Sequence, residues 1–569
     1  MRDRFDIAAA FREISRLLKL KGENPFKAQA FDRGARSLEQ LELDFDVLVK
    51  SRRLTQIGGI GNALAAVIEE LYRTGESTML EQLRNELPPG AVELSEISGL
   101  NLRKMIALHD ALHISGIADL KAACAEGLVR NVKGFGQKTE AKILAAIEKL
   151  EAREQRTLLN HALQEAERLL EYLRARPEVI CADIAGSLRR RKESVRHIHI
   201  VASTEEPEAV IDTFLCFPAL AQALEPERNR CVGRLACGLQ AEVHLVSPAE
   251  YIFSLHCLTG SAEHYAKLSA RARLKGIAMA PNERGAGNRR IDIECEEDIY
   301  GGLGMQYIPP ELRENEGEIE AASAGTLPSL VTPGSIQGIV HCHTIYSDGR
   351  HSIEEMALAA EAMGMKYLTI TDHSPSAYYA RGLTIDRLRA QWDEIARVQE
   401  RVKIKILKGT ESDILEDGSL DYPDNILERF DIVIASIHAR NKMNPDQMTK
   451  RLHRAMQWPL FKVWGHPLGR LIHSRPPLEC RVEEVLDAIA VSRAAVEING
   501  DPRRLDLEPR WIREARKRAI KFVVSADAHS TNSLGNLQYG IAMARRGWLA
   551  QDDVLNTLDI NDFMQAVRP

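Results

Sequence analysis

Histidines and carboxylates that could bind metal ions recur in the last third of this 569-residue sequence, at the ends of short apolar runs. His341 and His343 are separated by one residue, and alternate residues of a strand project to the same side, so both imidazoles can hold one ion. Mixed imidazole and carboxylate ligands suit Mn²⁺, Zn²⁺ or Fe²⁺ better than Mg²⁺ or Ca²⁺. The other candidates at run ends are His373, Glu411, His438, His466, Asp527 and His529.

Seven apolar runs have the character of strands, and six of them lead to these ligands. The runs alternate with amphipathic helices, which predicts parallel strands, crossover helices and a barrel. The C-terminal ends of barrel strands meet on one face, so ligands far apart in the sequence would converge there. Such a cage can activate water for attack on phosphorus. Glu411 is the candidate bridging ligand, and Arg440 is either a phosphate clamp or an ordinary surface arginine.

The motifs HCHTIYSDG, TDHS, GTESDI, SIHAR, GHP and SADAH resemble those of the PHP (polymerase and histidinol phosphatase) domain over about residues 336 to 565. The resemblance implies a distorted seven-stranded (β/α)7 barrel with a trinuclear metal site, and it adds Asp348 to the ligands and to the candidate catalytic residues. The implied metal ligands are His341, His343, Asp348, His373, Glu411, His438, His466, Asp527 and His529.

Two glycine turns stand between helical segments near the N-terminus, IGGIG with Gly59 and Gly61, and VKGFG with Gly134 and Gly136. Such turns let a phosphate approach the backbone and the N–H groups of the next helix. Lys138 and Lys142 follow the second turn and lie one helical turn apart. The pattern resembles the helix-hairpin-helix motif, which binds DNA without sequence preference. A third turn, ISGLN at residues 97–101, is degenerate and is interpreted as a structural turn.

The stretches KGENPFKAQAF, IAGSLRRRKESV, LTGSAEH and EDIYGGLGMQYIPPELRENEGEIEAA resemble a bacterial family X DNA polymerase that carries a C-terminal PHP domain. The resemblance spans nearly the whole chain. It implies an α+β palm and thumb of nucleotidyltransferase type after all-α helix-hairpin-helix domains. It also matches Gly186, Ser187, Arg189 and Arg190 to the loop that binds the phosphates of the incoming nucleotide.

The metal positions of that palm are substituted. The family has three aspartates there, whereas this sequence has His197, His199 and Glu242. Two divalent ions held close together repel each other strongly, and neutral imidazoles neither offset that repulsion nor suit Mg²⁺. We therefore predict polymerase activity that is absent or strongly reduced. A transition-metal site of His197, His199 and nearby His244 is one explanation of the substitutions, and decay of an unused site is the other.

Length and composition indicate a multidomain globular protein with a net charge of −6, so DNA binding must come from local sites. Nine scattered cysteines without a CxxC pair, and no apolar run of membrane-spanning length, lead us to expect a reducing cytoplasm and no membrane partner. The expected domains are a helical DNA-binding domain (1–85), a fingers-like domain (86–155), a palm (156–250), a thumb (251–320), a linker (321–336) and the PHP domain (337–569).

These patterns together predict a DNA-repair phosphoesterase. The family resemblance implies 3′-5′ exonuclease activity, with abasic-site endonuclease or 3′-phosphatase action as further options. Its cofactors would be two or three divalent ions, with Mn²⁺ favoured. Its partners would be gapped, nicked or 3′-recessed DNA ends, and dNTP if the palm still binds it. Two alternatives are a gap-filling polymerase that tolerates the His/His/Glu set and a DNA-end scaffold without catalysis.

Overall fold

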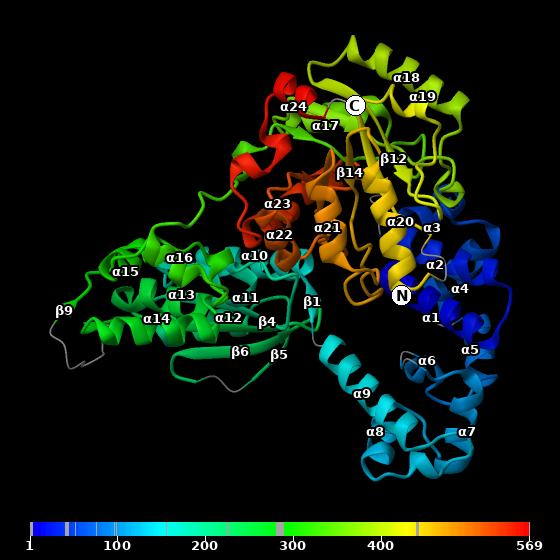
Figure 1. The fold of residues 1–569 in the computed structure, drawn as a ribbon. Coiled ribbons are helices and arrows are strands. Elements are labelled where there is room, and N and C mark those ends of the chain that lie inside the picture. Colours follow the sequence, from blue (N-terminus) through cyan, green and yellow to red (C-terminus); the bar gives the residue numbers. More distant parts are fainter. Residues whose placement is uncertain are drawn as a thin grey trace. The chain divides into compact units, whose positions relative to one another are not determined.

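The computed structural model describes residues 4–39, 45–51, 53–75, 77–95, 97, 99–154, 156–224, 227–279, 289–439 and 443–567. The chain divides into two compact units, Met1–Gln155 and Arg156–Pro569 (Figure 1). Among the described residues, no helix has the length and apolar character needed to cross a bilayer.

The first unit is all-α over its described residues, as predicted. Apolar side chains from Ile7 in the first helix to Ile147 in the last form one buried cluster. Short 3-10 turns, η1 (Leu54–Gln56) and η2 (Val129–Asn131), precede the two glycine turns. The helices are α1 (Arg4–Lys21), α2 (Pro25–Glu39), α3 (Phe45–Lys50), α4 (Asn62–Thr74), α5 (Thr78–Asn85), α6 (Ala91–Leu94), α7 (Leu102–Leu112), α8 (Ile117–Ala125) and α9 (Gln137–Glu154).

The second unit begins with a palm built on a five-stranded sheet of order β2-β4-β7-β6-β5, in which only β4 and β7 run parallel. Alternation along β4 buries Ile198 and Ile200 in the core, so His197 and His199 face the other side. The elements are β1 (Thr157–Leu158), α10 (Leu159–Arg174), β2 (Cys181–Ala185), α11 (Gly186–Arg189), β3 (Ser194–Val195), β4 (His197–Ser203), α12 (Pro207–Leu215), β5 (Leu220–Ala223), β6 (Arg230–Leu235) and β7 (Gln240–Val246).

The thumb follows with its own apolar cluster, from Leu268 to Leu330. Its elements are α13 (Tyr251–Thr259), α14 (Ala262–Leu274), β8 (Ile277–Ala278), β9 (Arg289–Arg290), α15 (Glu296–Gly302) and α16 (Glu318–Ala324). The segment 321–336, expected as a linker, includes the end of α16 and buries Leu330, Val331 and Ile336. Its small and proline-rich composition therefore belongs to a packed connection.

The C-terminal part is a nearly closed parallel barrel of seven strands in the order β10 to β16, as predicted. A parallel bridge between Cys342 and Ala528 joins the segments that follow the first and last strands. The strands are β10 (Gly338–Ile339), β11 (Tyr367–Ile370), β12 (Lys405–Asp413), β13 (Ile432–Ser436), β14 (Lys462–Trp464), β15 (Ala494–Asn499) and β16 (Phe522–Ser525).

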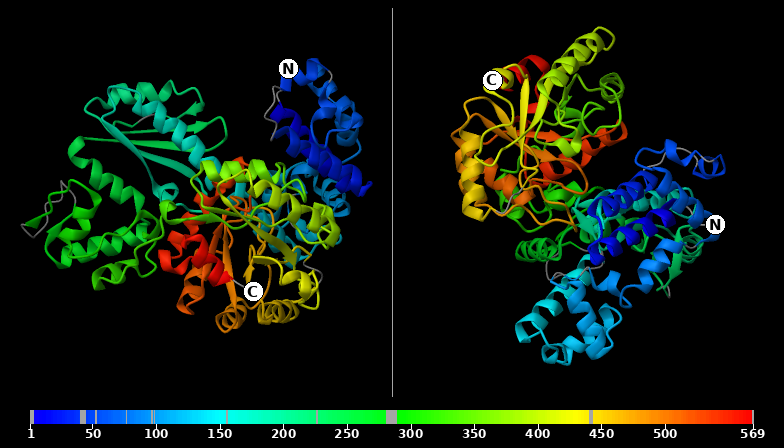
Figure 2. Two further views of the ribbon diagram at one scale, coloured as in Figure 1. Left: turned by 90° about the horizontal axis from the view of Figure 1, so that it is seen from above. Right: turned by 90° about the vertical axis from the view of Figure 1, so that its right-hand side faces the viewer.

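Helices surround these strands in both views of Figure 2. Their capping residues mark where they begin: Ser352 accepts a hydrogen bond from the backbone of Glu355, and Asn444 from that of Gln447. The helices are α17 (Ile353–Ala362), α18 (Ile385–Gln399), α19 (Asp424–Leu427), α20 (Pro445–Gln457), α21 (Val482–Ala490), α22 (Pro509–Lys517), α23 (Leu537–Arg546) and α24 (Ile560–Val567).

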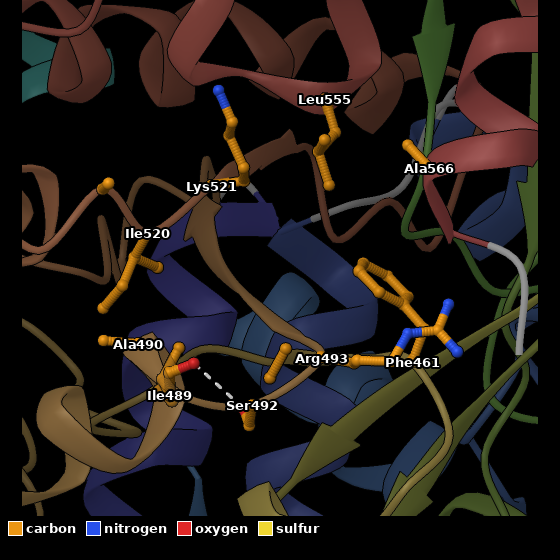
Figure 3. A pocket seen from close by; sticks show the side chains of 11 residues that line it. Phe461, Ile489, Ala490, Ser492, Arg493, Ile520, Lys521, Leu555 and Ala566 are labelled. Atoms are coloured by element: carbon orange, nitrogen blue, oxygen red, sulfur yellow. Dashed lines mark hydrogen bonds between the residues drawn. The ribbon is translucent and has the colours of Figure 1, made fainter.

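A pocket of about 360 Å³ opens at the amino ends of β14, β15 and β16 (Figure 3). Apolar side chains such as Phe461 and Ile520 line it, together with Arg493 and Lys521. It contains no histidine, cysteine or carboxylate, and it lies at the strand ends opposite those that carry the candidate ligands. The chemistry of the barrel therefore belongs to the other face.

Candidate metal centre and DNA-contacting elements

Glu411 is buried in β12, and its two carboxylate oxygens face different histidines. Oε1 lies 2.8 Å from His466 Nε2 and 3.2 Å from His438 Nε2. Oε2 lies 2.9 Å from His373 Nδ1 and 3.6 Å from His343 Nε2. A carboxylate that offers each oxygen to separate imidazoles has the arrangement expected of a ligand shared between ions.

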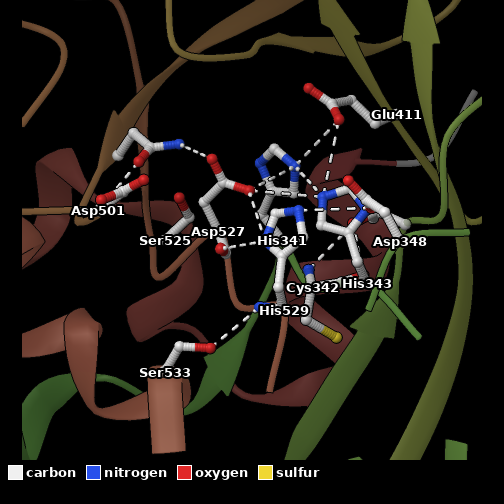
Figure 4. A network of polar contacts seen from close by, with 12 residues as sticks. His341, Cys342, His343, Asp348, Glu411, Asp501, Ser525, Asp527, His529 and Ser533 are labelled. Carbon is white, nitrogen blue, oxygen red and sulfur yellow. Dashed lines mark hydrogen bonds and ion pairs between the residues drawn. The ribbon is translucent and has the colours of Figure 1, made fainter. Parts of the chain in front are cut away.

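Two further carboxylates complete the cluster that Figure 4 shows from close by. Asp527 Oδ1 lies 3.4 Å from His343 Nε2, and Asp348 Oδ1 lies 3.4 Å from His529 Nε2. His341 joins through its Nε2, 3.7 Å from Asp527. Ligand atoms within 4.8 Å of one another form three overlapping groups in the barrel: His343, Asp348, His373 and His529; His341, His343 and Asp527; and His373, Glu411 and His438.

The cluster has the chemistry of a metal site. Buried His343 Nδ1 and His466 Nδ1 have no hydrogen-bond partner, although buried polar atoms are almost always paired. Burial and the imidazoles of His529 and His373 lower the pKa of His343 to about 3, which keeps this ring neutral, as a metal ligand must be. Burial opposes ionisation of Glu411, but the surrounding imidazoles hold its pKa well below the usual value. This donor set fits bound divalent ions of the transition series.

Carboxylates behind the cage orient its histidines. Glu497 Oε1 lies 2.5 Å from His341 Nδ1 and accepts a hydrogen bond of 2.6 Å from Ser525. Asp413 Oδ1 lies 3.1 Å from His438 Nδ1. Such partners fix the ring and its tautomer. Sequence analysis assigned no role to either carboxylate, although Glu497 lies in the one apolar run that had no ligand.

Asp372, in the TDHS motif, supports the loop that follows His343 and takes no part in the three groups. Its carboxylate accepts hydrogen bonds from Thr344 N at 2.8 Å and from Gln391 Nε2 at 2.6 Å. Burial raises the pKa of Asp372, and hydrogen bonds from Ser347 and Thr344 oppose the rise. The motif therefore supplies one ligand, His373, and one bracing residue.

Arg504 brings a guanidinium to the edge of the cage from the segment after β15. Its Nε lies 3.4 Å from Asp527 Oδ2, while its buried Nη1 has no hydrogen-bond partner. Arg440, predicted to be either a phosphate clamp or an ordinary surface arginine, lies outside the described residues. No local pattern marks Arg504, because the chain fold alone brings it to Asp527.

The glycine turns of the first unit have matching geometry. Gly59 and Gly134 adopt φ of 87° and 92°, a region that favours glycine. Gly61 and Gly136 have ordinary φ, and a Cβ at either position would meet nothing within 4 Å. Packing inside the unit therefore requires no glycine at these two positions, and both are open to the outside.

The third turn has the same backbone hydrogen bond. Leu100 N donates to Ile97 O at 3.2 Å, as Ile60 N donates to Ile57 O at 3.0 Å in the first turn. Gly99 also has a positive φ of 93°. The degenerate sequence thus forms the same hairpin as the other two.

In the second turn, Lys138 and Lys142 lie exposed on α9, while Ile143 of the same helix is buried. Glu140 pairs with Arg130 at 2.6 Å and takes its carboxylate away from the lysines. The exposed lysines follow the glycine turn directly, so cations and backbone N–H groups lie on one surface.

The predicted nucleotide-phosphate loop is held by the thumb. Gly186 begins the short helix α11 with φ of 66°, and Ser187 follows it. Arg189 donates to Glu296 at 2.7 Å. Arg190 donates to Glu314 at 2.9 Å and to the backbone oxygen of Thr259 at 2.7 Å. Both guanidinium groups are therefore engaged inside the protein.

The substituted palm positions also come together. His197 Nδ1 lies 3.3 Å from Glu242 Oε1, and His199 Nδ1 lies 3.8 Å from Glu242 Oε2. Arg230 donates to the same Oε2 at 2.8 Å. The palm thus contains a second cluster of imidazoles around one carboxylate, with a guanidinium already beside it.

Comparison with known proteins agrees with these parts. The helix-hairpin-helix domain matches residues 2–77, the SAM-like helix-hairpin-helix tandem residues 91–149, the DNA polymerase beta thumb residues 254–314, and the PHP domain residues 340–500. The DNA polymerase/3′-5′ exonuclease PolX of Bacillus subtilis (strain 168) is 34% identical over 562 residues, 98% of each chain. A probable phosphatase of Thermoanaerobacter sp. (strain X514) is 30% identical over 229 residues, 38% of this chain and 89% of its own length.

The fold and its sites define a polymerase body with helix-hairpin-helix domains, joined to a PHP phosphoesterase barrel. The similarity over nearly the whole chain identifies the family. The chain belongs to the bacterial family X DNA polymerases that carry a C-terminal PHP domain. The tandem match over 91–149 covers the third turn, so its interpretation as a mere structural turn gives way to a hairpin of the DNA-binding type.

Proposed function

We propose that this protein is a metal-dependent DNA phosphodiesterase, a 3′-5′ exonuclease, with polymerase activity that is absent or strongly reduced. The observation that carries the proposal is the meeting of eight other candidate ligands, from several strand ends, around Glu411. Two or three divalent ions, with Mn²⁺ favoured, are the cofactors that this donor set suits. Its relative from Bacillus subtilis is named a 3′-5′ exonuclease, and the PHP domain is shared with probable phosphatases.

Three groups of residues have separate roles in the proposed reaction. His341, His343, Asp348, His373, Glu411, His438, His466, Asp527 and His529 hold the ions, which when bound lower the pKa of water and neutralise charge on a phosphate. Arg504 contacts a nonbridging phosphate oxygen through its unpaired Nη1. Gly59, Gly61, Gly134, Gly136, Lys138 and Lys142 hold the backbone of gapped, nicked or 3′-recessed DNA.

Two features of the palm support the loss of polymerisation. Glu242 is the only carboxylate of the palm cluster, and Arg230 neutralises it. A two-ion polymerase site needs several anionic oxygens to offset the repulsion of its ions. The other feature is the phosphate loop, where the thumb carboxylates Glu296 and Glu314 occupy Arg189 and Arg190.

The test uses a 5′-labelled primer annealed to a longer template, with four dNTPs and Mn²⁺, resolved on a denaturing gel. We expect the primer to shorten. The variant His341→Ala/His343→Ala should lose at least about 100-fold in rate, as should native protein with a chelator, because both remove the charge stabilisation that the cage provides. His161→Ala, which changes an exposed histidine of α10, is the matched control and should keep the native rate.

The two alternatives, a gap-filling polymerase and a DNA-end scaffold, predict different primer lengths on the gel. A primer that lengthens, and stops lengthening in Glu242→Ala, identifies a working gap-filling polymerase, the second candidate, which the name of the Bacillus subtilis relative favours. A primer of unchanged length with bound DNA would leave only an end-binding scaffold. Either result contradicts the proposed nuclease.

A further inference from the structure

Four polar side chains gather on one face of the palm sheet, the face opposite Ile198 and Ile200. His197 and His199 alternate along β4, Glu242 and His244 alternate along β7, and His199 pairs with Glu242 in the parallel register. Alternate residues share a face, so all four project to the same side. Gly186 leaves room for this arrangement, because a Cβ there would come within 2.9 Å of the His199 ring.

The donor atoms have the spacing of a small coordination site. The distances from Glu242 are 3.3 Å to His197 Nδ1, 3.8 Å to His199 Nδ1 and 3.9 Å to His244 Nε2. Zinc bonds of 2.0–2.1 Å in a tetrahedron put neighbouring donors roughly 3.3 Å apart. The donor atoms of His197, His199 and Glu242 all lie within 4.8 Å of one another, whereas His244 lies outside this group and must move closer to complete a tetrahedron.

Two of the imidazoles have unused ligand atoms. His199 Nδ1 and His244 Nε2 are buried and have no hydrogen-bond partner, which is uncommon for buried polar atoms. The two rings stack with centroids 5.8 Å apart.

We propose that the palm binds one transition-metal ion of the zinc type, held by His197, His199 and Glu242, with His244 as the fourth donor. Polymerase magnesium does not fit this donor set, because Mg²⁺ requires oxygen ligands and an octahedral shell. Four protein donors would close the coordination sphere of a tetrahedral ion. The ion then joins β4 to β7 as a structural element and leaves no position for a nucleotide.

Arg230 is the competitor of this ion. Its guanidinium donates to Glu242 Oε2 at 2.8 Å and 3.3 Å, and Gln240 donates to Oε1 at 3.0 Å. Arg230 helps hold the pKa of Glu242 below its ordinary value despite burial, and the ion must displace this contact or use Oε1. Removal of Arg230 should therefore tighten binding, whereas a purely structural cluster would gain no affinity.

The test counts zinc in the full-length chain, by dialysis against Zn²⁺ followed by elemental analysis. Two pairs are compared: native with His197→Ala/His199→Ala, and His341→Ala/His343→Ala with the same palm changes added. Each pair should differ by one equivalent of zinc per chain. The two members of a pair have the same barrel residues, so the difference between them counts only the zinc bound by the palm. When Co²⁺ replaces Zn²⁺, the palm changes should remove one visible absorption signal of four-coordinate Co²⁺ in each pair. His161→Ala should keep both the equivalent of zinc and the Co²⁺ signal.

Two further variants test the site if the double change disturbs folding. His197 has 41% of its side chain exposed, so His197→Asn removes a donor with little loss of packing and should weaken zinc binding about 10- to 100-fold. Arg230→Gln should tighten it by about tenfold. Equal zinc in both pairs, or unchanged affinity in these two variants, would overturn the proposal. Primer shortening by His197→Asn at the native rate would separate this site from the proposed nuclease.

Discussion

At the scale of single residues, variants of Arg504 test whether this side chain contacts the phosphate without taking part in metal binding. Arg504→Met should lower kcat/KM for primer shortening about 10²–10³-fold, because a cation that faces a developing negative charge is lost. Arg504→Lys should restore part of the rate, while the metal content of both variants stays native. Arg503→Met is the matched control, since Arg503 is 65% exposed and pairs with Asp501. Loss of metal in Arg504→Met would instead assign Arg504 to the support of Asp527.

At the scale of elements, the second hairpin and the start of α9 should contribute two phosphate contacts. Lys138→Ala/Lys142→Ala should weaken binding to DNA of any sequence and reduce the slope of log K against log salt by about two, because each contact releases about one counterion. Fluorescence anisotropy at several salt concentrations measures both quantities. Lys403→Ala/Lys405→Ala, which changes exposed lysines at the amino end of β12, should leave the slope unchanged. An unaltered slope in the hairpin variant would exclude this surface.

Strand β14 contains a buried lysine, Lys462, and its titration should make the free energy of unfolding depend on pH. Lys462 is fully buried and donates to the backbone oxygen of Leu460 at 2.9 Å, and burial lowers its pKa to about 8 from 10.5. The unfolded chain therefore binds more protons between those values, so stability rises with pH across that window, by about 3 kcal/mol in full. Lys462→Met should lack this rise.

All five tryptophans lie between residues 392 and 548, so their fluorescence during urea unfolding reports the barrel. The free energy of unfolding of Lys462→Met relative to the native chain should fall steadily from pH 8 to pH 10. Lys405→Met, at an exposed position of β12 in the same barrel, provides the comparison. If the difference in free energy of unfolding between the two chains does not change with pH, Lys462 does not change its protonation on unfolding in this pH range.

At the scale of the whole molecule, buried ion pairs join the palm and thumb to the barrel within the second unit. Arg470 donates to Glu193 of the palm at 2.7 Å and to Arg504 O at 2.8 Å, so one side chain connects the palm to the segment beside the cage. Glu193→Gln should destabilise the unit by about 1–3 kcal/mol, because Arg470 loses one of its two charged partners in a buried site and keeps only Glu508.

The more exposed pair Arg513–Glu316, at 2.8 Å, is the control for this prediction. Glu316→Gln should cost less than about 1 kcal/mol. Urea unfolding followed by circular dichroism and by tryptophan fluorescence measures both variants. Equal losses in the two variants would show that Arg470 has no special part in docking the barrel.

The sequence by itself determined the seven strands and eight of the nine candidate ligands, while Asp348 came from the resemblance to the PHP domain. Each of the eight lies at or just beyond an apolar run, and the topology of a parallel barrel brings such positions to one face. The hairpin glycines were equally predictable, since positive φ and close backbone approach are local properties. The palm substitutions could also be read directly, because alternation along β4 fixes the face of His197 and His199.

Only the tertiary structure decided the partners of these residues. Arg504 beside Asp527, Glu497 behind His341, and Arg230 beside Glu242 are contacts between separate elements, and no local spacing encodes them. The engagement of Arg189 by Glu296 likewise depends on how the thumb folds back onto the palm. Local periodicity fixes which side of an element a residue faces, whereas the packing of elements fixes what it faces, and the chemistry of both clusters depends on the second.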